Sequence, residues 1–331
     1  MRPPEFWKAD AQGRDRAPVL QALLAPAAFL YEAAGAHRQR SAKPRRVAAP
    51  VICVGNLTLG GAGKTPVTRA LRARLGPGAH VLLRGYGGTA KGVTRVRPDA
   101  RASEVGDEAL LHAADGPTWT SIDRVAGAEA AIAAGARLIL MDDGFQNPGL
   151  AKDFSIVVID AAAQFGNGRV FPAGPLRESA ARGLARADAV LLMGAPPPKE
   201  EWPQALQTFK RPILHAALEP TAPPPPEPLA AFAGIARPEK FFDALSAAGA
   251  DLVETAPYRD HHPYSQGELT WLAKLADERG ARLITTEKDA ARLSPEWRAR
   301  VATYPIVARF RDEAALDALL APIAARLGAD A

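Results

Sequence analysis

The stretch that decides the fold is Val51-Ile-Cys-Val-Gly-Asn-Leu-Thr-Leu-Gly-Gly-Ala-Gly-Lys-Thr-Pro66. It opens with a short apolar run typical of a buried strand, and a helical pattern follows from Pro66 to Leu75. A glycine-rich turn ending in Gly-Lys-Thr between a strand and a helix is the setting of a phosphate-binding P-loop. We therefore predict that nucleotide phosphate binds the loop of Thr58, Leu59, Gly60, Gly61, Ala62, Gly63, Lys64 and Thr65.

The residue types in this loop suit phosphate chemistry. Its glycines let backbone amides turn inward, Lys64 can bridge the β- and γ-phosphates, and the Thr65 hydroxyl can hold Mg²⁺. Thr58 stands where the usual pattern has its first glycine, so the loop is a variant. A glycine-rich connection without function is the alternative, and the order of strand, loop and helix argues against it.

A second motif, Leu138-Ile-Leu-Met-Asp142-Asp143, is an apolar run that ends in two carboxylates. This is the arrangement of a Walker B element, in which a carboxylate holds Mg²⁺ through its water shell. A plain strand-ending turn is the alternative, because Asp143-Gly144 is a common turn pair. The P-loop already demands a magnesium ligand, so we favour the metal role and leave open which aspartate supports it.

Outward from these motifs, short apolar runs alternate with helical segments. The pattern predicts an α/β fold, a P-loop NTPase domain with a mainly parallel sheet. The expected strands are Val51–Val54, Val81–Leu83, Leu138–Met141, Ile156–Ile159 and Val190–Met193, and the expected helices include Pro66–Leu75, Gly106–Ala114 and Asp123–Ala134.

Proline-rich stretches at 195–198 and 220–228 read as linkers or edge connections, and we predict a domain boundary near residue 228. The P-loop core then spans residues 36–228, and residues 229–331 form a smaller C-terminal α/β domain. In that domain we expect strands at Leu229–Phe232, near Leu252 and at Leu283–Thr285, a helix around Phe241, and a helix opened by the capping box Ser265 to Glu268.

Residues 1–35 are predicted to form a separate N-terminal segment with an amphipathic helix from Ala17 to Gly35, interrupted or kinked near Pro26. Basic residues follow it. An apolar stripe with a polybasic flank suits a helix lying in the interface of an anionic membrane, and a helix packed on its own domain is the alternative. The stripe comprises Leu20, Leu23, Leu24, Ala27, Leu30 and Tyr31, and the flank His37, Arg38, Arg40, Lys43, Arg45 and Arg46.

The composition and charge of the chain limit the kinds of molecule that it could bind. The chain is 47% hydrophobic with a net charge of +5, and no Asp or Glu lies between Glu32 and Asp99, so we expect that stretch to face an anion. Nucleotide phosphate and lipid headgroups are favoured over nucleic acid, because no nucleic-acid motif is present.

The single Cys53 indicates a reducing, cytoplasmic setting. We find no run of about 18 apolar residues and no signal peptide, and so expect neither membrane spanning nor secretion; no obligate protein partner is indicated.

Two absences separate the subclasses of P-loop protein. A deviant Walker ATPase would carry a lysine just before the paired glycines, where this chain has Leu59. A GTPase would show Asn/Thr-Lys-x-Asp, whereas Lys288 and Asp289 are adjacent in the sequence Thr286-Glu-Lys288-Asp289. A P-loop GTPase or metallochaperone and a membrane-associated, ATP-switched scaffold remain as the competing interpretations.

Together the motifs resemble those of the tetraacyldisaccharide 4'-kinase family, from Pro4 to about Arg292. The departures are Leu83, where the family usually has Ser, and Asn147, where it usually has His. The matching motifs are Val54-Gly-Asn-Leu-Thr-Leu-Gly-Gly-Ala-Gly-Lys-Thr-Pro66, Arg84-Gly-Tyr-Gly-Gly88, Val105-Gly-Asp-Glu108, Asp142-Asp-Gly-Phe-Gln146, Gly174-Pro-Leu-Arg-Glu178, Asp260-His-His-Pro-Tyr264 and Thr285-Thr-Glu-Lys-Asp289.

The resemblance implies an ATP-dependent lipid kinase. It would transfer the γ-phosphate of ATP to the 4'-hydroxyl of a tetraacylated glucosamine disaccharide 1-phosphate, forming the 1,4'-bisphosphate precursor of lipid A. Such an enzyme is peripheral to the cytoplasmic face of the inner membrane, which would give the basic N-terminal part its anionic surface.

The resemblance also implies roles for individual residues. Asp107 is the candidate base for the acceptor hydroxyl, and His261 the histidine that orients it. Arg124 and Arg177 are expected to neutralise charge on the transferring phosphoryl group. The expected Mg²⁺ site comprises Thr65, Asp142, Asp143, Gln146 and Glu178. For Lys288 and Asp289 we derive no role.

Overall fold

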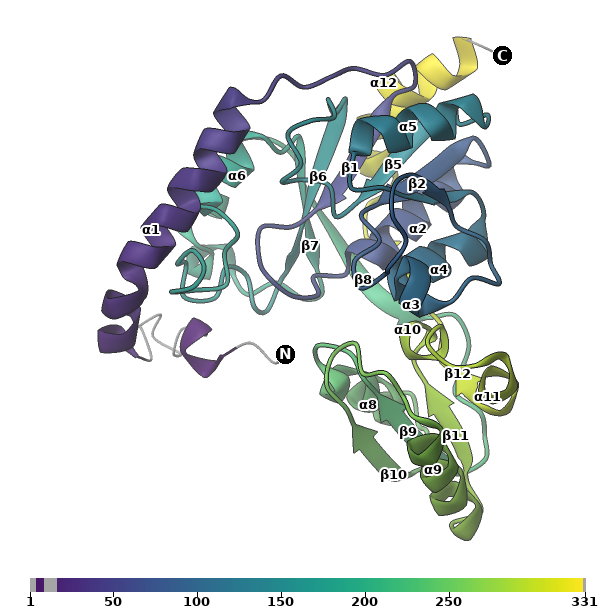
Figure 1. The fold of residues 1–331 in the computed structure, drawn as a ribbon. Coiled ribbons are helices and arrows are strands. Elements are labelled where there is room, and N and C mark those ends of the chain that lie inside the picture. The colour runs from purple at the N-terminus through teal and green to yellow at the C-terminus, as the bar shows by residue number, and fades with distance from the viewer. Residues whose placement is uncertain (1–3, 9–16, 330–331) are drawn as a thin grey trace.

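The computed structural model describes residues 4–8 and 17–329, which are built around two sheets (Figure 1). The first sheet has nine strands in the order β13-β8-β7-β6-β1-β5-β2-β4-β3. All neighbours are parallel except the pairs β3–β4 and β8–β13. The mainly parallel α/β fold is therefore confirmed. The strands are β1 Val51–Gly55, β2 Ala79–Leu83, β3 Thr94–Arg95, β4 Thr118–Thr120, β5 Leu138–Asp142, β6 Phe154–Asp160, β7 Ala189–Met193, β8 Ile213–Pro220 and β13 Ile306–Phe310.

Strand β1 occupies the middle of this sheet, and every one of its residues is buried. It pairs with β5 on one side and with β6 on the other, and Val54 lies opposite Asp142. Parallel strands end at the same edge of a sheet, where ligands bind. The register therefore sets the start of the predicted P-loop beside the predicted Walker B carboxylates.

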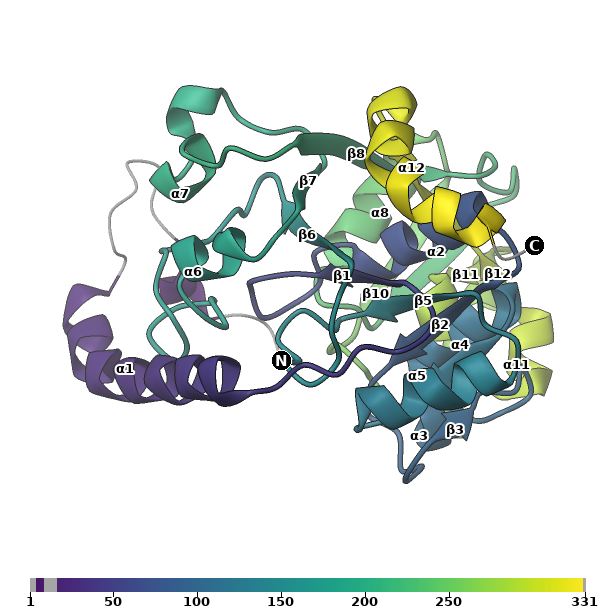
Figure 2. The same cartoon turned by 90° about the horizontal axis from the view of Figure 1, so that it is seen from above.

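Helices cover both faces of the first sheet (Figures 1 and 2). On one face α2, α4 and α12 pack against the strands, through side chains such as Leu71, Ala109 and Leu316. On the other face α5, α6 and α7 do so, through Ala128, Leu184 and Leu206. The helices are α2 Lys64–Leu75, α3 Ala102–Val105, α4 Asp107–Asp115, α5 Arg124–Ala133, α6 Ala180–Ala185, α7 Gln204–Gln207 and α12 Glu313–Ala329, with the 3-10 turns η1 Glu5–Trp7 and η2 Lys199–Glu201.

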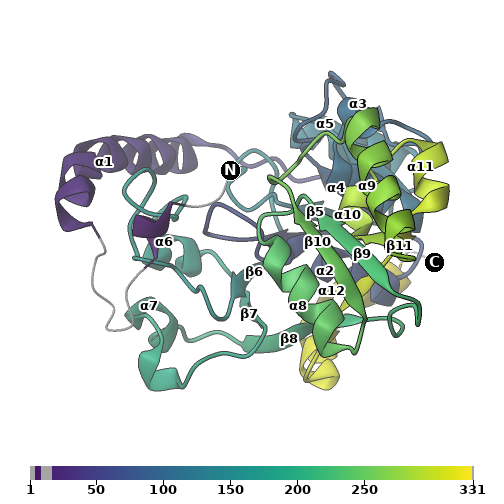
Figure 3. The same ribbon diagram turned by 90° about the horizontal axis from the view of Figure 1, so that it is seen from below.

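The second sheet has the strand order β10-β9-β11-β12, all parallel (Figure 3). Helices α8 and α9 contribute to separate cores, around Phe241 and around Leu272. The predicted capping box opens α9: Ser265 accepts from the backbone N–H of Glu268, whose carboxylate accepts in return. The elements are β9 Leu229–Ala233, β10 Leu252–Pro257, β11 Arg282–Thr285, β12 Ala302–Thr303, α8 Pro238–Ala247, α9 Gln266–Glu278, α10 Glu287–Ala290 and α11 Pro295–Arg300.

The chain does not end in the second sheet, which corrects the predicted domain 229–331. Strand β13 returns to the first sheet and pairs antiparallel with β8, with Ile306 opposite Pro220. Phe310 and Leu320 then join the core of the first sheet. The physical reason is that β8 would otherwise be an open edge, which β13 covers. The five residues Ile306–Phe310 do not by themselves reveal which sheet the strand completes.

Helix α1, Pro18–Ser41, runs without interruption through Pro26 and ends six residues beyond the predicted Gly35. Arg38 and Arg40 therefore lie in its last turn, not after it. The side facing the protein carries Gln21, Ala28 and Ala36, whereas most of the predicted apolar stripe is exposed. Helix α1 thus packs on its own domain through the side opposite the stripe, and the membrane role of the exposed stripe stays a prediction. The exposed apolar residues of α1 include Val19, Leu20, Leu23, Phe29, Leu30 and Tyr31.

By length and composition alone α1 could cross a membrane, contrary to our expectation, and only 17% of its apolar window is buried. One such helix is weak evidence of spanning. Polar side chains tie α1 to the protein along its length: Gln21 donates to the carbonyl of Phe6, and Gln39 to the carbonyl of Gln146, both at 3.0 Å. The α1 carboxylate of Glu32 accepts from the backbone of residue 179 at 3.2 Å. Residues 1–3 and 9–16 of the predicted N-terminal segment lie outside the described residues.

Several cations of the stretch between Glu32 and Asp99 form ion pairs within the protein, and the expectation that the stretch faces an external anion stays a prediction. Among the described residues, no ion pair is recorded for the exposed Arg38, Arg40 and Lys43 at the end of α1. The internal pairs are Arg45–Glu129, Arg46–Asp153, Lys64–Asp143, Arg69–Asp115, Arg69–Glu287, Arg74–Asp317 and Arg97–Asp99.

A chain cut after residue 305 should be strongly destabilised, because β8 loses its partner and the first core loses the side chains of α12. We expect insoluble protein or a clearly lower midpoint of thermal unfolding. The control replaces residues 221–305 with a short turn, since Pro220 and Ile306 are partners in the register. Equal cooperativity and equal midpoints for the two proteins would contradict the place of β13.

Candidate functional site

The predicted P-loop runs from the end of β1 to the start of α2, and polar contacts hold its shape. The side chain of Asn56 donates to the carbonyl of Thr58 at 2.8 Å and to that of Gly60 at 3.3 Å. The backbone N–H of Leu59 donates to the carbonyl of Pro175 at 2.8 Å. Asn56, which we did not single out from the sequence, therefore acts as the internal brace of the loop.

Gly63 ends the loop with a φ of +86°, and α2 starts at the next residue, Lys64. A side chain other than glycine would be strained at that φ. The first N–H groups of a helix have no partner within it and favour an anion, so this end of α2 suits phosphate. Lys64 is 11% exposed, with its Nζ 3.7 Å from Asp143 Oδ1. Burial lowers the pKa of Lys64, and Asp143 opposes that shift.

Asp142 is buried against the loop at 3% exposure. Its Oδ2 accepts hydrogen bonds from Thr65 Oγ1 at 2.9 Å and from His112 Nε2 at 2.8 Å. Within the part of the chain that the structure describes, its Oδ1 has no partner. A buried carboxylate oxygen rarely lacks one, and an oxygen beside a P-loop hydroxyl is the donor type that hydrated Mg²⁺ prefers. Thr65 and Asp142 thus fit the predicted metal site.

Asp143 is engaged by cations. It has a φ of +55° and accepts two hydrogen bonds from Arg177, at 3.0 and 3.2 Å, while facing Lys64. Burial by itself would raise the pKa of Asp143, but Lys64 and Arg177 outweigh burial and lower it, so the carboxylate is ionised. Asp143 holds two of the three predicted phosphate-binding cations, Lys64 and Arg177, in place. Of the two aspartates, Asp142 better fits the metal.

Gln146 and Glu178 support the loop from behind. Both oxygens of Glu178 accept from Arg186, at 2.7 and 2.8 Å. Gln146 donates to the carbonyl of Asn56 at 2.9 Å and to Glu178 at 3.3 Å, and it accepts from Arg177 at 3.3 Å. These contacts make the two residues supports of Asn56 and Arg177, and the metal role that we predicted for Gln146 and Glu178 stays a prediction.

Arg124 starts α5 and is 5% exposed. Its guanidinium donates to the carbonyl of Ser121, and its Nε has no partner among the described residues. Burial, and next the charge of Arg84, lower the pKa of Arg124 to about 10, while Asp143 opposes the shift. A buried guanidinium with an unused donor near Asp143 is consistent with the predicted phosphate role.

Asp107 and His261 are hydrogen-bonded to each other, although Asp107 belongs to the part of the chain around the first sheet and His261 to the part around the second sheet. Asp107 is the first residue of α4, and its carboxylate accepts from His261 Nδ1 at 2.9 Å and from Arg292 Nε at 2.7 Å. Burial alone would raise the pKa of Asp107. The hydrogen bond from His261 and the charges of Arg292 and Lys288 outweigh burial and hold the pKa well below its usual range. The carboxylate is therefore ionised at neutral pH.

Lys288, for which the sequence suggested no role, fixes the state of the histidine. Its ammonium lies 3.3 Å from His261 Nε2 and 2.8 Å from Glu108 Oε1. An ammonium only donates, so Nε2 must accept. The hydrogen on the ring then lies on Nδ1, where it is donated to Asp107. In this arrangement Asp107 and Lys288 contact the two ring nitrogens of His261 and fix the orientation of the ring.

Asp289 and Arg292 complete the contact between the two sheets. Asp289 is fully buried and accepts from Arg292 at 2.7 Å, from the hydroxyl of Tyr264 at 2.8 Å and from the backbone of Gly234 at 2.9 Å. Arg292 thereby spans Asp289 and Asp107. Sequence reasoning missed it, although its spacing of three residues from Asp289 could have indicated one turn of helix.

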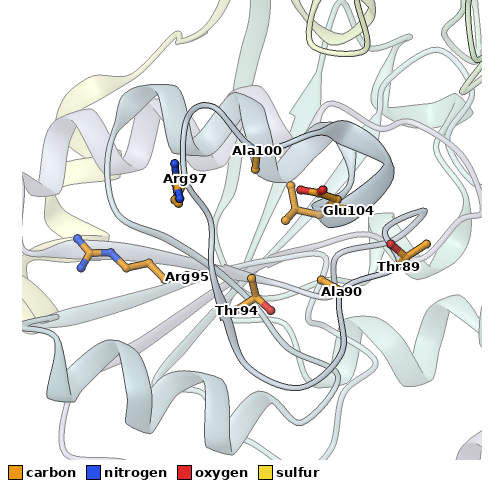
Figure 4. A pocket seen from close by; sticks show the side chains of 8 residues that line it. Thr89, Ala90, Thr94, Arg95, Arg97, Ala100 and Glu104 are labelled. Carbon is orange, nitrogen blue, oxygen red and sulfur yellow. The ribbon is translucent and has the colours of Figure 1, made fainter. Parts of the chain in front are cut away.

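A cavity of about 280 Å³ lies within the 88–105 region, close to the start of α4 (Figure 4). Its charged lining residues are already engaged: Arg97 pairs with Asp99, and Arg95 lies over the Trp119 ring. The side chain of Glu104 accepts from the backbone of Arg101. This hollow therefore adds no free charged group to the phosphate site.

A central parallel sheet, a P-loop, a buried Walker B aspartate and a carboxylate–histidine pair define a P-loop phosphotransferase. The model of the family described as tetraacyldisaccharide-1-P 4'-kinase matches residues 20–324. The chain belongs to this family and is an ATP-dependent kinase.

Relatives agree over nearly the whole length. The chain is 50% identical to the tetraacyldisaccharide 4'-kinase of Hyphomonas neptunium, with 99% of each chain covered. It is 51% identical to that of Phenylobacterium zucineum, with 96% of this chain and 98% of the relative covered. A crystal structure of LpxK from Aquifex aeolicus in complex with ATP matches with a TM-score of 0.75 and 27% identity, covering 92% of this chain and 99% of that chain.

Replacing Lys64 by Ala should reduce turnover by about 10²-fold or more, because a cation is lost where phosphate charge concentrates. The measurement is the steady-state rate of phosphate transfer from ATP. Lys91→Ala is a control, since this exposed lysine lies outside the loop. Retention of more than about a tenth of the activity by Lys64→Ala would contradict the phosphate role.

Proposed function

We propose that this chain transfers the γ-phosphate of ATP to the 4'-hydroxyl of a tetraacyldisaccharide 1-phosphate, forming lipid IVA in lipid A biosynthesis. The observation that carries the proposal is the hydrogen bond between Asp107 and His261, because it gives an ATP-dependent kinase a group able to take the proton of an alcohol. The relatives' names supply the acceptor. A GTPase, a metallochaperone or a switched scaffold would account for neither the pair nor the family match.

The phosphate side of the reaction falls to the P-loop. Its amides and Lys64 bind the β- and γ-phosphates, and Arg177, held by Asp143, faces the same side. Thr65 and Asp142 would hold Mg²⁺, which when bound neutralises charge on the nucleotide phosphates. Arg124 supplies a further buried cation. Charge accumulating on the transferring group is thus met by positive charge already in place.

The acceptor side falls to Asp107. An ionised carboxylate with a low pKa is a weak base. Phosphoryl transfer passes through a loose transition state, in which the new bond to the acceptor oxygen is still weak and the hydroxyl proton need not yet have left. Asp107 therefore first orients the hydroxyl by accepting its hydrogen bond, then takes the proton as the new P–O bond forms. The Nδ1–H of His261 holds the carboxylate in the required orientation, and Lys288 holds the histidine.

Labelled ATP, Mg²⁺ and detergent-dispersed tetraacyldisaccharide 1-phosphate test the proposal directly. We expect a phosphorylated lipid product, and a loss of about 10²-fold in kcat for Asp107→Ala and for His261→Ala, with little change in nucleotide affinity. The double variant should be little worse than the worse single variant, because the two residues act as one unit.

The control is His262→Ala, which removes a neighbouring histidine that pairs with Glu268 instead. ATP hydrolysis without lipid product would count against the acceptor. Additive losses, or a large loss of ATP affinity in His261→Ala, would show that the two residues have separate tasks.

We further propose that the kinase works peripherally at the cytoplasmic face of the inner membrane, with α1 lying in the interface. The exposed apolar side of α1 suits the acyl boundary, and the cations of its last turn suit lipid phosphates. Glu32 and Gln39 of α1 are hydrogen-bonded to residues 179 and 146 of the protein. If α1 crossed the membrane, the part of the protein bonded to it would have to lie in the lipid as well. A position of α1 in the interface avoids this.

Replacing Leu23 and Leu30 by Gln should weaken binding to anionic vesicles and leave ATP binding unchanged, because both side chains are exposed and distant in sequence from the P-loop. Flotation with vesicles of anionic phospholipid measures the first quantity, and titration with a fluorescent ATP analogue the second. Ala33→Gln, also exposed on α1, serves as the control. Undiminished flotation of the Leu23 and Leu30 variant would remove the membrane role of this face.

A further inference from the structure

His112 is a fully buried histidine that belongs to none of the motifs of the chain. It lies on α4, and its Nε2 is 2.8 Å from Oδ2 of Asp142. We assign the hydrogen of this bond to Nε2 of His112, because a carboxylate oxygen is an acceptor. Its Nδ1 has no partner among the described residues.

An unpartnered ring nitrogen makes simple packing a poor explanation for His112. A leucine or phenylalanine would fill the core without burying a polar atom that lacks a hydrogen bond. Within residues 4–8 and 17–329, the one polar contact of the ring is with Asp142. The histidine is therefore explained by what it does to that carboxylate.

Two donors converge on the same oxygen of Asp142. Thr65 approaches Oδ2 from α2, and His112 approaches it from α4. Together they fix the rotation of the carboxylate and leave Oδ1 unpartnered among the described residues. Because the bond from His112 does not involve the P-loop, it persists when the Thr65 hydroxyl is used by a ligand.

The backbone around His112 is anchored as well. Arg72 of α2 donates to the carbonyl of His112 at 2.8 Å, so the helix that follows the P-loop is tied to α4 at this turn. Asp107 begins the same helix. One rigid element thus carries the proposed base at its first residue and the support of the Walker B carboxylate near its end.

We propose that His112 is a positioning residue that orients Asp142 for hydrated Mg²⁺ bound with the nucleotide. The proposal rests on the metal role proposed for Asp142 and not on the identity of the lipid acceptor. It requires no change in the charge of His112.

The test compares two replacements in the full-length protein. In His112→Gln the amide nitrogen takes the place of Nε2 and can still donate to Asp142, whereas His112→Leu removes the donor. We expect His112→Leu to weaken binding of ATP in the presence of Mg²⁺ by about 10-fold or more, as for other residues that orient a metal ligand. Binding of ATP in EDTA should not change, and His112→Gln should recover most of the loss.

Isothermal titration of each variant with ATP, with Mg²⁺ and with EDTA, measures both affinities without any lipid. The result is therefore independent of the acceptor assay. If His112→Leu does not fold, His112→Asn replaces it, because the shorter amide takes the place of Nδ1 and does not reach Asp142. Wild-type affinity for ATP with Mg²⁺ in these variants, an equal loss in EDTA, or a failure of His112→Gln to recover binding would each overturn the proposal.

Discussion

The pairing of β1 with β5 is the constraint on which the rest of the site depends. It sets Val54 opposite Asp142. Because the two strands are parallel, they both end at the same edge of the sheet. The P-loop that follows one strand and the carboxylates that end the other therefore meet without further adjustment. The hydrogen bond from Thr65 to Asp142 is the visible result.

A second set of charges joins the two sheets at Asp107. Arg292, His261 and Lys288 come from the second sheet region, and their positive charge and hydrogen bonds hold an acidic group of the first. A buried ion pair adds little net stability, because desolvation offsets the attraction, but removing one partner leaves a charge uncompensated. The arrangement therefore determines the relative position of the two sheets more than it adds to the stability of their contact. It also keeps the Asp107 carboxylate ionised, so that it can accept a hydrogen bond from the hydroxyl of the lipid substrate.

The sequence predicted what local patterns determine. The P-loop, the Walker B strand and the capping box at Ser265 all follow from short-range rules, and the structure has each of them. It did not predict which side chains pair with one another, for example that Arg186 donates to both oxygens of Glu178. Arg292 and His112 were missed for the same reason, since their partners are distant in sequence. The return of β13 to the first sheet was missed because pairing across 86 residues, from Pro220 to Ile306, leaves no local trace.

Helix α1 is bonded to residues that support the phosphate site. Gln39 of α1 donates to the carbonyl of Gln146, whose side chain in turn accepts from Arg177. Glu32 of α1 accepts from the backbone of residue 179, next to Glu178. The element with the exposed apolar face is thus bonded directly to the supports of the P-loop. In the membrane arrangement proposed above, the helix that contacts lipid would therefore be held by the same residues that hold the loop for the nucleotide phosphates.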